Sequence, residues 1–264
     1  MISIIISTHK PNLLNKISDN ISQTIGVEYE IIPIVNHRKY SLCEAYNLGA
    51  QKAKYPFLCF VHEDVIFLKN NWGKRLVSVI NSDSSIGLVG VVGTKFMSTY
   101  PNAGWGTGPY LKNMYRGKIF LDDNLSYRDF DPRSIKTDIE DVVSLDGLFL
   151  FTTKEIYNIV SFDEKLLTGF HGYDTDFSLS IFLNGFRVIT DRGLEVIHYS
   201  PGNYDKEYAS ANKKIKKKWK GKLPVASSDL NQNQLLLSYY NILCWAGYLR
   251  NMIVRKLNLP IKLK

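Results

Sequence analysis

The feature that most constrains the fold is a set of strand-like segments without a polar face, separated by segments with helical spacing. The run ISIIIS (residues 2–7) is almost continuously β-branched, as in strands that are buried on both faces. FLCFV (57–61) is a second apolar run. Between them, SLCEAYNLGAQKA (41–53) has helical spacing, and Ser41 and Glu44 match a helix capping box. Strands that are buried on both faces need helices on both sides of their sheet, so the pattern predicts an α/β fold.

The alternation continues along the N-terminal part of the chain. Pro11 marks the start of a helix, and YEIIPIV (29–35) is a further strand. WGKRLVSVI (72–80) has helical spacing, and IGLVGVV (86–92) is a fourth strand. Strands that alternate with helices predict a parallel, doubly wound sheet.

Composition and cysteine content exclude several classes of protein. The 264 residues are 45% hydrophobic and 22% charged, which is typical of a globular protein. The three cysteines, Cys43, Cys59 and Cys244, have neither the number nor the spacing of a disulfide framework or a structural zinc site. No basic segment precedes the first apolar run, so we expect no signal peptide. These features predict a protein of the reducing cytoplasm.

Positive charge is concentrated near the C-terminal end. Residues 206–264 hold 13 Lys or Arg against two acids, so this tail carries +11. Because the whole chain carries +8, the remainder carries −3. A nucleic-acid enzyme would more often surround its active cleft with positive charge, so we expect no nucleic-acid partner. The separate basic tail instead suits an anionic surface such as the inner face of a membrane.

Polar and ionisable residues follow three of the predicted strands. They are Thr8 and His9 after the first strand, Asn36 after the second, and His62, Glu63 and Asp64 after the third. An unpaired buried charge is costly, so this edge must reach solvent or hold a ligand that compensates the charge. Ligands of such sheets bind beyond the carboxyl ends of the strands, which predicts a crevice for a metal and a diphosphate. No predicted strand is followed by GxGxxG, and no GxxxxGK[ST] is present, which argues against a typical dinucleotide-binding dehydrogenase and a P-loop NTPase.

With motifs further along, these segments resemble the family 2 glycosyltransferases of the GT-A fold over about residues 1–200. Such enzymes have strands of the types SIIIPTY and EIIVVDDGS, a helix with Asn-x-Gly and a strand that ends in Asp-X-Asp. This chain has SIIISTH, EIIPIVNHR, AYNLGAQKA and CFVHEDV in the same order. The later matches are Asp146-Gly147, Phe162-Asp163-Glu164, Tyr173-Asp174-Thr175-Asp176, Gly185-Phe186-Arg187-Val188 and His198. The resemblance implies a GT-A domain over 1–204, with a single Rossmann-like mixed sheet flanked by helices, and a basic C-terminal helical extension over 205–264.

The chain departs from the family pattern at acidic positions. Val35 and Asn36 stand where the family has paired acids, so an amide replaces the usual carboxylate contact to the nucleotide base. His62 occupies the first position of Asp-X-Asp, and Tyr173 occupies the Glu position of Glu-Asp. Asp64 remains as the acid of its motif, and whether His62 replaces a metal ligand stays open. In this motif the chain resembles the bacterial transferases with His-x-Asp at this strand end, which are common in capsule and lipopolysaccharide assembly.

The resemblance implies an inverting, metal-dependent hexosyltransferase that uses Mn²⁺ or Mg²⁺. Asp64 and His198 would bind the cation, which stabilises charge on the leaving nucleoside diphosphate. Asp174 would take the proton of the acceptor hydroxyl. The residues implied for donor binding are Thr8, His9, Asn36, Asn47, Glu63 and Asp64, and those for acceptor binding are Asp146, Gly147 and Asp176. The implied partners are a UDP-linked sugar donor and a glycan or lipid-linked glycan acceptor of bacterial surface polysaccharide synthesis.

Simpler alternatives exist for several assignments. Asp174 could be only a helix N-cap, His198 a hydrogen-bonded core histidine, and Asp64 and Asp146 turn residues. A nucleotidyltransferase would also place carboxylates around a metal, although STHKPN lacks a glycine-rich triphosphate loop. A catalytically inactive carbohydrate-binding domain would account for the substituted acids.

Two segments have less regular patterns. Residues 94–117 are rich in Gly, Pro, Asn and aromatics without a steady period, and we interpret them as a loop that acts as a lid or binds the acceptor. We expect loop geometry over residues 95–140 to set the choice of sugar. Residues 230–249 have no charged side chain, but their apolar content is too short for a membrane span. This segment fits an interfacial helix, a helix packed on the body, or a contact in a homo-oligomer.

Overall fold

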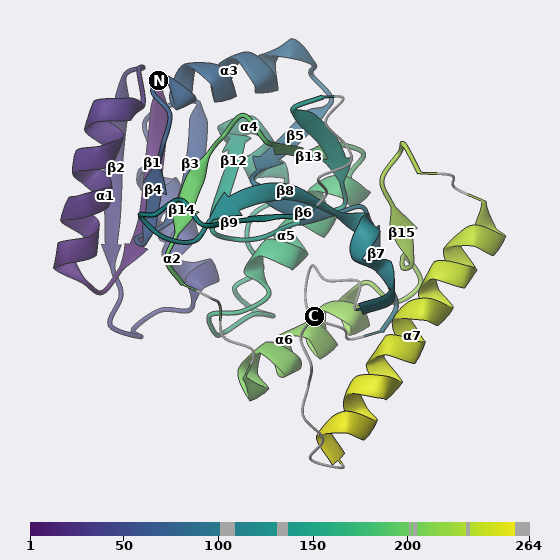
Figure 1. Cartoon of the computed structure of the whole chain (residues 1–264). Coiled ribbons are helices and arrows are strands. Elements are labelled where there is room, and N and C mark those ends of the chain that lie inside the picture. The colour runs from purple at the N-terminus through teal and green to yellow at the C-terminus, as the bar shows by residue number, and fades with distance from the viewer. Residues whose placement is uncertain (101–108, 131–136, 201, 203–204, 231–232, 257–264) are drawn as a thin grey trace.

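The computed structural model describes residues 1–100, 109–130, 137–200, 202, 205–230 and 233–256. Its centre is a seven-stranded sheet with the strand order β10-β13-β5-β12-β3-β1-β2 (Figure 1). The strands span Ile2–Thr8 (β1), Tyr29–Val35 (β2), Phe57–His62 (β3), Ile86–Gly90 (β5), Ile139–Val142 (β10), Phe149–Thr153 (β12) and Arg187–Asp191 (β13). The four strands predicted in the N-terminal part are therefore present, and they run parallel to one another.

The sheet is mixed, because β10 and β12 run antiparallel to their neighbours. The chain enters β12 from the carboxyl edge of the parallel strands, where the His62 N–H donates to the Leu148 carbonyl at 3.1 Å. A strand that begins at the carboxyl edge must run against the parallel set. The wholly parallel sheet predicted from the strand and helix alternation is therefore wrong, and the mixed sheet implied by the family resemblance is confirmed.

Helices cover both faces of the sheet, as strands without a polar face require (Figure 1). They span Pro11–Thr24 (α1), Leu42–Lys52 (α2), Trp72–Ser82 (α3), Lys154–Ile159 (α4) and Tyr173–Leu183 (α5). Ile4 of β1 shares a hydrophobic cluster with Ile17 of α1 and Leu76 of α3. Ile5 points to the opposite face, where a Cβ on Gly49 of α2 would lie 2.2 Å from Ile5 Cγ2. Glycine at this position therefore lets α2 approach the sheet closely.

A second sheet lies beyond the carboxyl edge, with the order β11-β6-β8-β14-β4 and with β9 paired to β8. Its strands span Val65–Phe67 (β4), Val92–Thr94 (β6), Tyr115–Phe120 (β8), Tyr127–Asp129 (β9), Ser144–Leu145 (β11) and Val196–His198 (β14). The antiparallel pairing of β4 with β14 places His198 opposite Val65. This pairing brings two distant parts of the sequence to the end of β3.

The expectation of a loop over residues 95–140 is wrong for much of the segment. Besides β8, β9 and the start of β10, it contains the 3₁₀ helix η1 (Pro109–Met114) and β7 (Phe96–Met97). The strand β8 carries Arg116, which donates to Glu140, and Lys118, which lies over the Phe120 ring. These charged side chains conceal the strand, because no apolar alternation is left in the sequence. Residues 101–108 and 131–136 of the segment lie outside the described residues.

The C-terminal extension is attached to the body. It contains α6 (Lys206–Lys218), β15 (Val225–Ala226) and α7 (Gln234–Lys256), and β15 pairs with β7. Ala211 and Ile215 of α6 belong to the hydrophobic cluster that includes α2 and α5. Leu237 and Cys244 of α7 pack in a separate cluster with Phe96. The boundary predicted between residues 204 and 205 thus falls just before a helix that shares the body's core.

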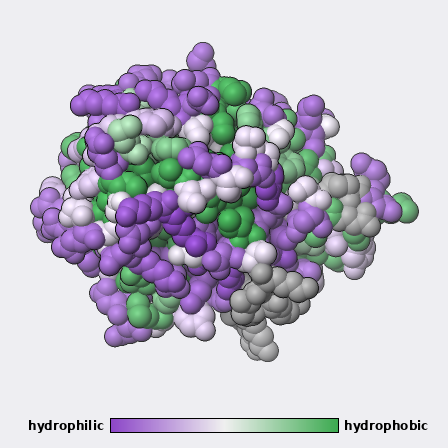
Figure 2. Space-filling model, turned by 90° about the horizontal axis from the view of Figure 1, so that it is seen from above, coloured by the Kyte–Doolittle hydropathy of each residue, from purple (hydrophilic) through white to green (hydrophobic). Residues whose placement is uncertain are grey.

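The surface seen in Figure 2 is largely hydrophilic, with hydrophobic side chains visible between hydrophilic ones near its middle. Within the described part of the chain, every helix is too short or too polar to span a membrane.

Candidate active site

A cavity of about 1200 Å³ opens at the carboxyl edge of the main sheet. Its walls come from the ends of β1, β2 and β3, the turn between β11 and β12, the start of α5 and the end of β14. The predicted site residues that line it are Thr8, His9, Asn36, Glu63, Asp64, Asp146, Gly147, Asp174 and His198. The fold thus brings together side chains that are far apart in the sequence, and most of the predicted site lies in one place.

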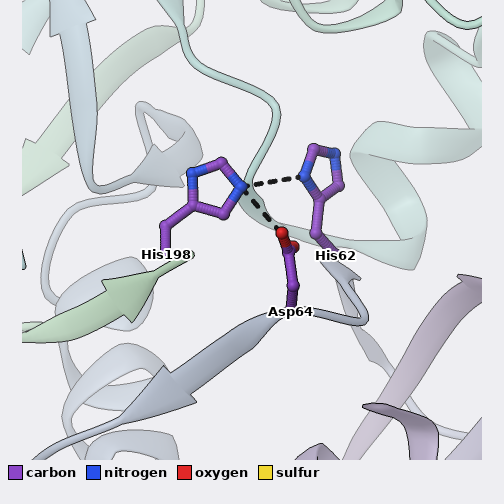
Figure 3. Close-up of side chains that lie close together, drawn as sticks. All are labelled: His62, Asp64 and His198. Atoms are coloured by element: carbon purple, nitrogen blue, oxygen red, sulfur yellow. Dashed lines mark hydrogen bonds and ion pairs between the residues drawn. The ribbon is translucent and has the colours of Figure 1, made fainter. Parts of the chain in front are cut away.

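His62, Asp64 and His198, which all line this cavity, form a cluster (Figure 3). His198 Nε2 lies 3.4 Å from His62 Nδ1 and 3.5 Å from Asp64 Oδ1. The ligand atoms of the three residues all lie within 4.8 Å of one another, which is a spacing that one metal ion can bridge. His62, whose part the sequence left open, therefore joins the two predicted ligands. The sequence clue to His62 was its position, because it stands where the family motif has its first acid.

The protonation of His62 suits a metal ligand. Burial, and then the neighbouring His198, lower the pKa of His62 to about 4. The imidazole is therefore neutral at neutral pH, and one of its ring nitrogens carries a free lone pair.

Glu63 holds the turn that leads from β1 into α1. Its Oε2 accepts hydrogen bonds from Thr8 Oγ1 at 2.5 Å and from the backbone N–H groups of His9 and Lys10 at 3.2 Å each. Its Oε1 lies 2.9 Å from His9 Nδ1. Thr8, His9 and Glu63 were each predicted to bind the donor, and the structure joins them into one wall of the cavity.

Asn36 shapes the loop between β2 and α2. Its side-chain oxygen accepts from the Tyr40 N–H at 3.0 Å, and its amide donates to the Tyr40 carbonyl at 3.1 Å. The amide also lies 3.3 Å from Ser7 Oγ. Asn36 lines the cavity, and these bonds fix the backbone there.

Asp174 is the second residue of α5 and not its N-cap. The helix begins at Tyr173, and the N-cap is Gly172, whose φ of 81° is readily adopted by glycine. Asp174 Oδ2 accepts from the Gly147 N–H at 3.0 Å, and Oδ1 accepts from the Thr175 N–H at 2.7 Å. Burial, and then the charge of Asp146, raise the pKa of Asp174 to about 7. A carboxyl with this pKa can exchange a proton at neutral pH.

Two predicted site residues do not line the cavity. The Asn47 amide donates to Glu164 Oε2 at 2.7 Å, and its oxygen accepts from the Tyr157 hydroxyl at 2.6 Å. Both bonds fix α2 within the body. Asp176 is 2% exposed, and its carboxylate accepts from Lys218 Nζ at 2.7 Å. The structure therefore places Asn47 in the core, and it places Asp176 at the contact between α5 and α6.

Comparisons with known proteins agree with this fold. A family model described as "Glycosyltransferase like family" matches residues 3–219. The structure is similar to that of GalNAc-T7 with UDP, GalNAc and Mn²⁺, with a TM-score of 0.54 and 18% identity over 75% of this chain and 43% of that one. It is also similar to residues 1–349 of S. aureus TarS, with a TM-score of 0.54 and 13% identity over 99% of this chain and 75% of that one. No curated protein matches the chain.

The two structural similarities, at identities this low, concern the fold alone, which is the GT-A fold expected from the sequence. The chain spans less than half of the length of GalNAc-T7.

Proposed function

Because the chain belongs to the glycosyltransferase-like family whose model spans residues 3–219, we propose that it is an inverting, metal-dependent transferase that takes a hexose from a UDP-linked donor. The observation that carries the proposal is that a metal-type cluster and a carboxyl with a pKa of about 7 face the same cavity. We assign the acceptor to the class of glycans or lipid-linked glycans, in bacterial surface polysaccharide synthesis on the cytoplasmic side of the membrane.

The residues present fit a divalent cation. His62, Asp64 and His198 would hold it with two nitrogens and one carboxylate. Mg²⁺ is usually bound through oxygen ligands, so the two imidazoles favour Mn²⁺. When bound, the cation would offset the negative charge that develops on the departing nucleoside diphosphate. GalNAc-T7, which was crystallised with UDP and Mn²⁺, provides a precedent for this combination within the fold.

Asp174 is the proposed base of the reaction. It would accept the proton of the acceptor hydroxyl while the hydroxyl oxygen forms a bond to the anomeric carbon. The bond between that carbon and the diphosphate oxygen breaks with its electron pair on the diphosphate. Attack from the face opposite the leaving group inverts the configuration. The turn at Asp146 and Gly147, which Asp174 holds through the Gly147 N–H, would lie beside the acceptor.

We also propose that α7 rests on an anionic lipid surface. One side of this helix packs on the body, but six large apolar side chains elsewhere on it are exposed: Leu235, Tyr239, Ile242, Trp245, Met252 and Ile253. Residues 230–264 contain five Lys or Arg and no acid, so their charge complements acidic headgroups. The same charge would repel a second copy of the segment, which makes lipid the better partner.

A panel of nucleotide sugars tests the proposed reaction. The protein is incubated with UDP-, GDP- and CDP-linked sugars, Mn²⁺ and bacterial lipid-linked glycans, and nucleoside diphosphate release is measured with and without EDTA. We expect release from a UDP-sugar that EDTA abolishes. Release of pyrophosphate from nucleoside triphosphates would identify a nucleotidyltransferase. If folded protein released nothing from any donor, an inactive binding domain would be the better account.

A further inference from the structure

Tyr173 contacts the cluster of His62, Asp64 and His198 through His62. Its hydroxyl oxygen is 2.6 Å from His62 Nε2, and the residue is 5% exposed. A Cβ on Gly147 would lie 2.0 Å from the same hydroxyl, so the turn above it closes tightly over the oxygen. The ring packs edge-on to Tyr46, with ring centroids 5.6 Å apart. The hydroxyl is therefore held in one position against the imidazole.

The contact joins two departures from the family pattern. His62 stands at the first acidic position of Asp-X-Asp, and Tyr173 stands at the Glu position of Glu-Asp. These positions are 111 residues apart in the chain, yet their side chains share a hydrogen bond. Exchange of both residues removes two acids from the site and puts a neutral, bonded pair in their place.

The hydrogen bond with the Tyr173 hydroxyl determines which nitrogen of His62 carries the proton. A neutral imidazole has one N–H and one lone pair, and a metal-bound histidine usually donates its other N–H to a fixed acceptor. His62 Nδ1 faces His198, whereas Nε2 faces Tyr173. If Nε2 carries the proton and donates it to the tyrosine oxygen, the Nδ1 lone pair points into the cluster. If the hydroxyl instead donates to Nε2, the proton sits on Nδ1 and blocks that position.

We propose that Tyr173 is a positioning residue that accepts the Nε2–H of His62 and so fixes this histidine as the third protein ligand of the divalent cation. This inference rests on the metal site of the proposed function. It assigns to Tyr173 no contact with substrate. Its effect passes through the tautomer and the orientation of one imidazole.

The substitution Tyr173→Phe tests this role, because it removes the hydroxyl and keeps the ring. Tyr157→Phe is a matched control. Tyr157 is buried in the same hydrophobic cluster as Tyr173. Its hydroxyl donates to Asn47 Oδ1 at 2.6 Å, away from the cavity. The affinity for Mn²⁺ in the presence of UDP is measured from the electron paramagnetic resonance signal of free Mn²⁺. We expect Tyr173→Phe to weaken binding by about 10- to 100-fold, as the loss of such a partner typically does, and Tyr157→Phe to leave it unchanged.

Two further measurements separate this role from a packing effect. In a His62→Ala background, Tyr173→Phe should cause no additional loss of Mn²⁺ affinity, because its effect passes through the imidazole. Long-range ¹H–¹⁵N spectra of the metal-free protein should show the proton of His62 on Nε2, and this preference should weaken in Tyr173→Phe.

Several outcomes would overturn the inference. Unchanged Mn²⁺ affinity in folded Tyr173→Phe would do so and would leave the proposed transferase intact. A proton on Nδ1 of His62, or an equal loss of affinity in Tyr157→Phe, would also overturn it. If the parent protein bound no Mn²⁺ with UDP, both the metal site and this inference would fail. Tyrosine-dependent Mn²⁺ binding without any sugar transfer would support the inference and count against the transferase.

Discussion

Two acids on the first turn of α5 face different surroundings. Asp174 lines the cavity and bonds to the Gly147 N–H, whereas Asp176 is buried against α6. Residues two apart on an α-helix project about 200° apart, so their side chains leave on opposite sides. In the helix, this spacing explains why Asp176, which was predicted to bind the acceptor, does not line the cavity beside Asp174. The spacing alone does not show which acid faces the ligand, because that depends on how α5 packs.

The substitution Asp174→Asn should abolish most of the transfer. It keeps the shape of the side chain and one acceptor oxygen, but it removes the base. A positioned base typically contributes about 10²- to 10⁴-fold, so we expect the transfer rate to fall by at least about a hundredfold. Calorimetry should show that the variant still binds UDP with Mn²⁺. Near-normal turnover by a folded variant would assign the base to another residue, with Asp146 the first candidate.

The raised pKa of Asp174 makes transfer depend on pH. The base is active only when ionised, so kcat should rise with pH and level off above about 7. Folding raises this pKa above its unfolded value, so the group's contribution to stability is present at low pH and is lost as pH rises through about 7. The free energy of unfolding of Asp174→Asn, relative to the parent, should therefore increase between about pH 5 and about pH 8. A flat rate profile together with a constant stability difference would contradict this assignment.

Elements with a strong local pattern were predictable from the sequence. The capping box of α2 is present, since the Glu44 N–H donates to Ser41 Oγ at 3.2 Å and the Ser41 N–H donates to Glu44 Oε2 at 2.7 Å. The strand β8 was not predicted, because pairing with β6, β9 and β14 makes it a strand despite its charged residues. The position of Asn47 was not predictable for a related reason. Its place in the family motif was visible in the sequence, but its bonds to Tyr157 and Glu164 were not.

We expect the salt bridge from Lys218 of α6 to Asp176 of α5 to contribute more to stability than the salt bridge from Lys218 to Asp163. Lys218 Nζ pairs with Asp176 at 2.7 Å and with Asp163 at 2.9 Å, but the Asp176 side chain is 3% exposed and that of Asp163 is 31% exposed. In urea unfolding, Asp176→Asn should cost about 1–3 kcal/mol, as expected for a buried charged hydrogen bond. Asp163→Asn should cost less than about 1 kcal/mol, as is typical of exposed pairs. Equal effects of the two changes would show that burial of the pair does not matter.

At the scale of the whole molecule, one end of the main sheet holds the cavity with the candidate site, and the extension holds the exposed apolar helix. The strand ends could be expected to converge from the sequence alone, because parallel strands share a carboxyl edge. The position of His198 at this edge could not be expected from the sequence, because it requires β14 to pair with β4 in a second sheet. Likewise, the sequence left α7 between a packed and an interfacial helix. The structure combines the two, with Cys244 buried and Ile242 59% exposed.

Binding of α7 to lipid should depend on its exposed side chains. We expect the triple change Leu235→Ser, Ile242→Ser and Trp245→Ser to reduce cosedimentation with phosphatidylglycerol vesicles by at least about tenfold, because each buried apolar side chain contributes roughly 1 kcal/mol or more. Ile159→Ser on α4 is the control, since Ile159 is 62% exposed and lies outside the extension. Unchanged vesicle binding, together with a shift from dimer to monomer in gel filtration, would instead identify a second copy as the partner.

The most direct test of the metal-dependent transferase is the binding of UDP and Mn²⁺ to Asp64→Ala. Asp64 lines the cavity and lies 3.5 Å from His198 Nε2. Asp19→Ala, at an exposed position of α1, serves as the control. Titration calorimetry should show that Mn²⁺ strengthens UDP binding in the parent and in Asp19→Ala, and that folded Asp64→Ala loses this strengthening together with transfer. If Asp64→Ala bound Mn²⁺ and UDP as tightly as the parent, the assignment of the metal site would be wrong.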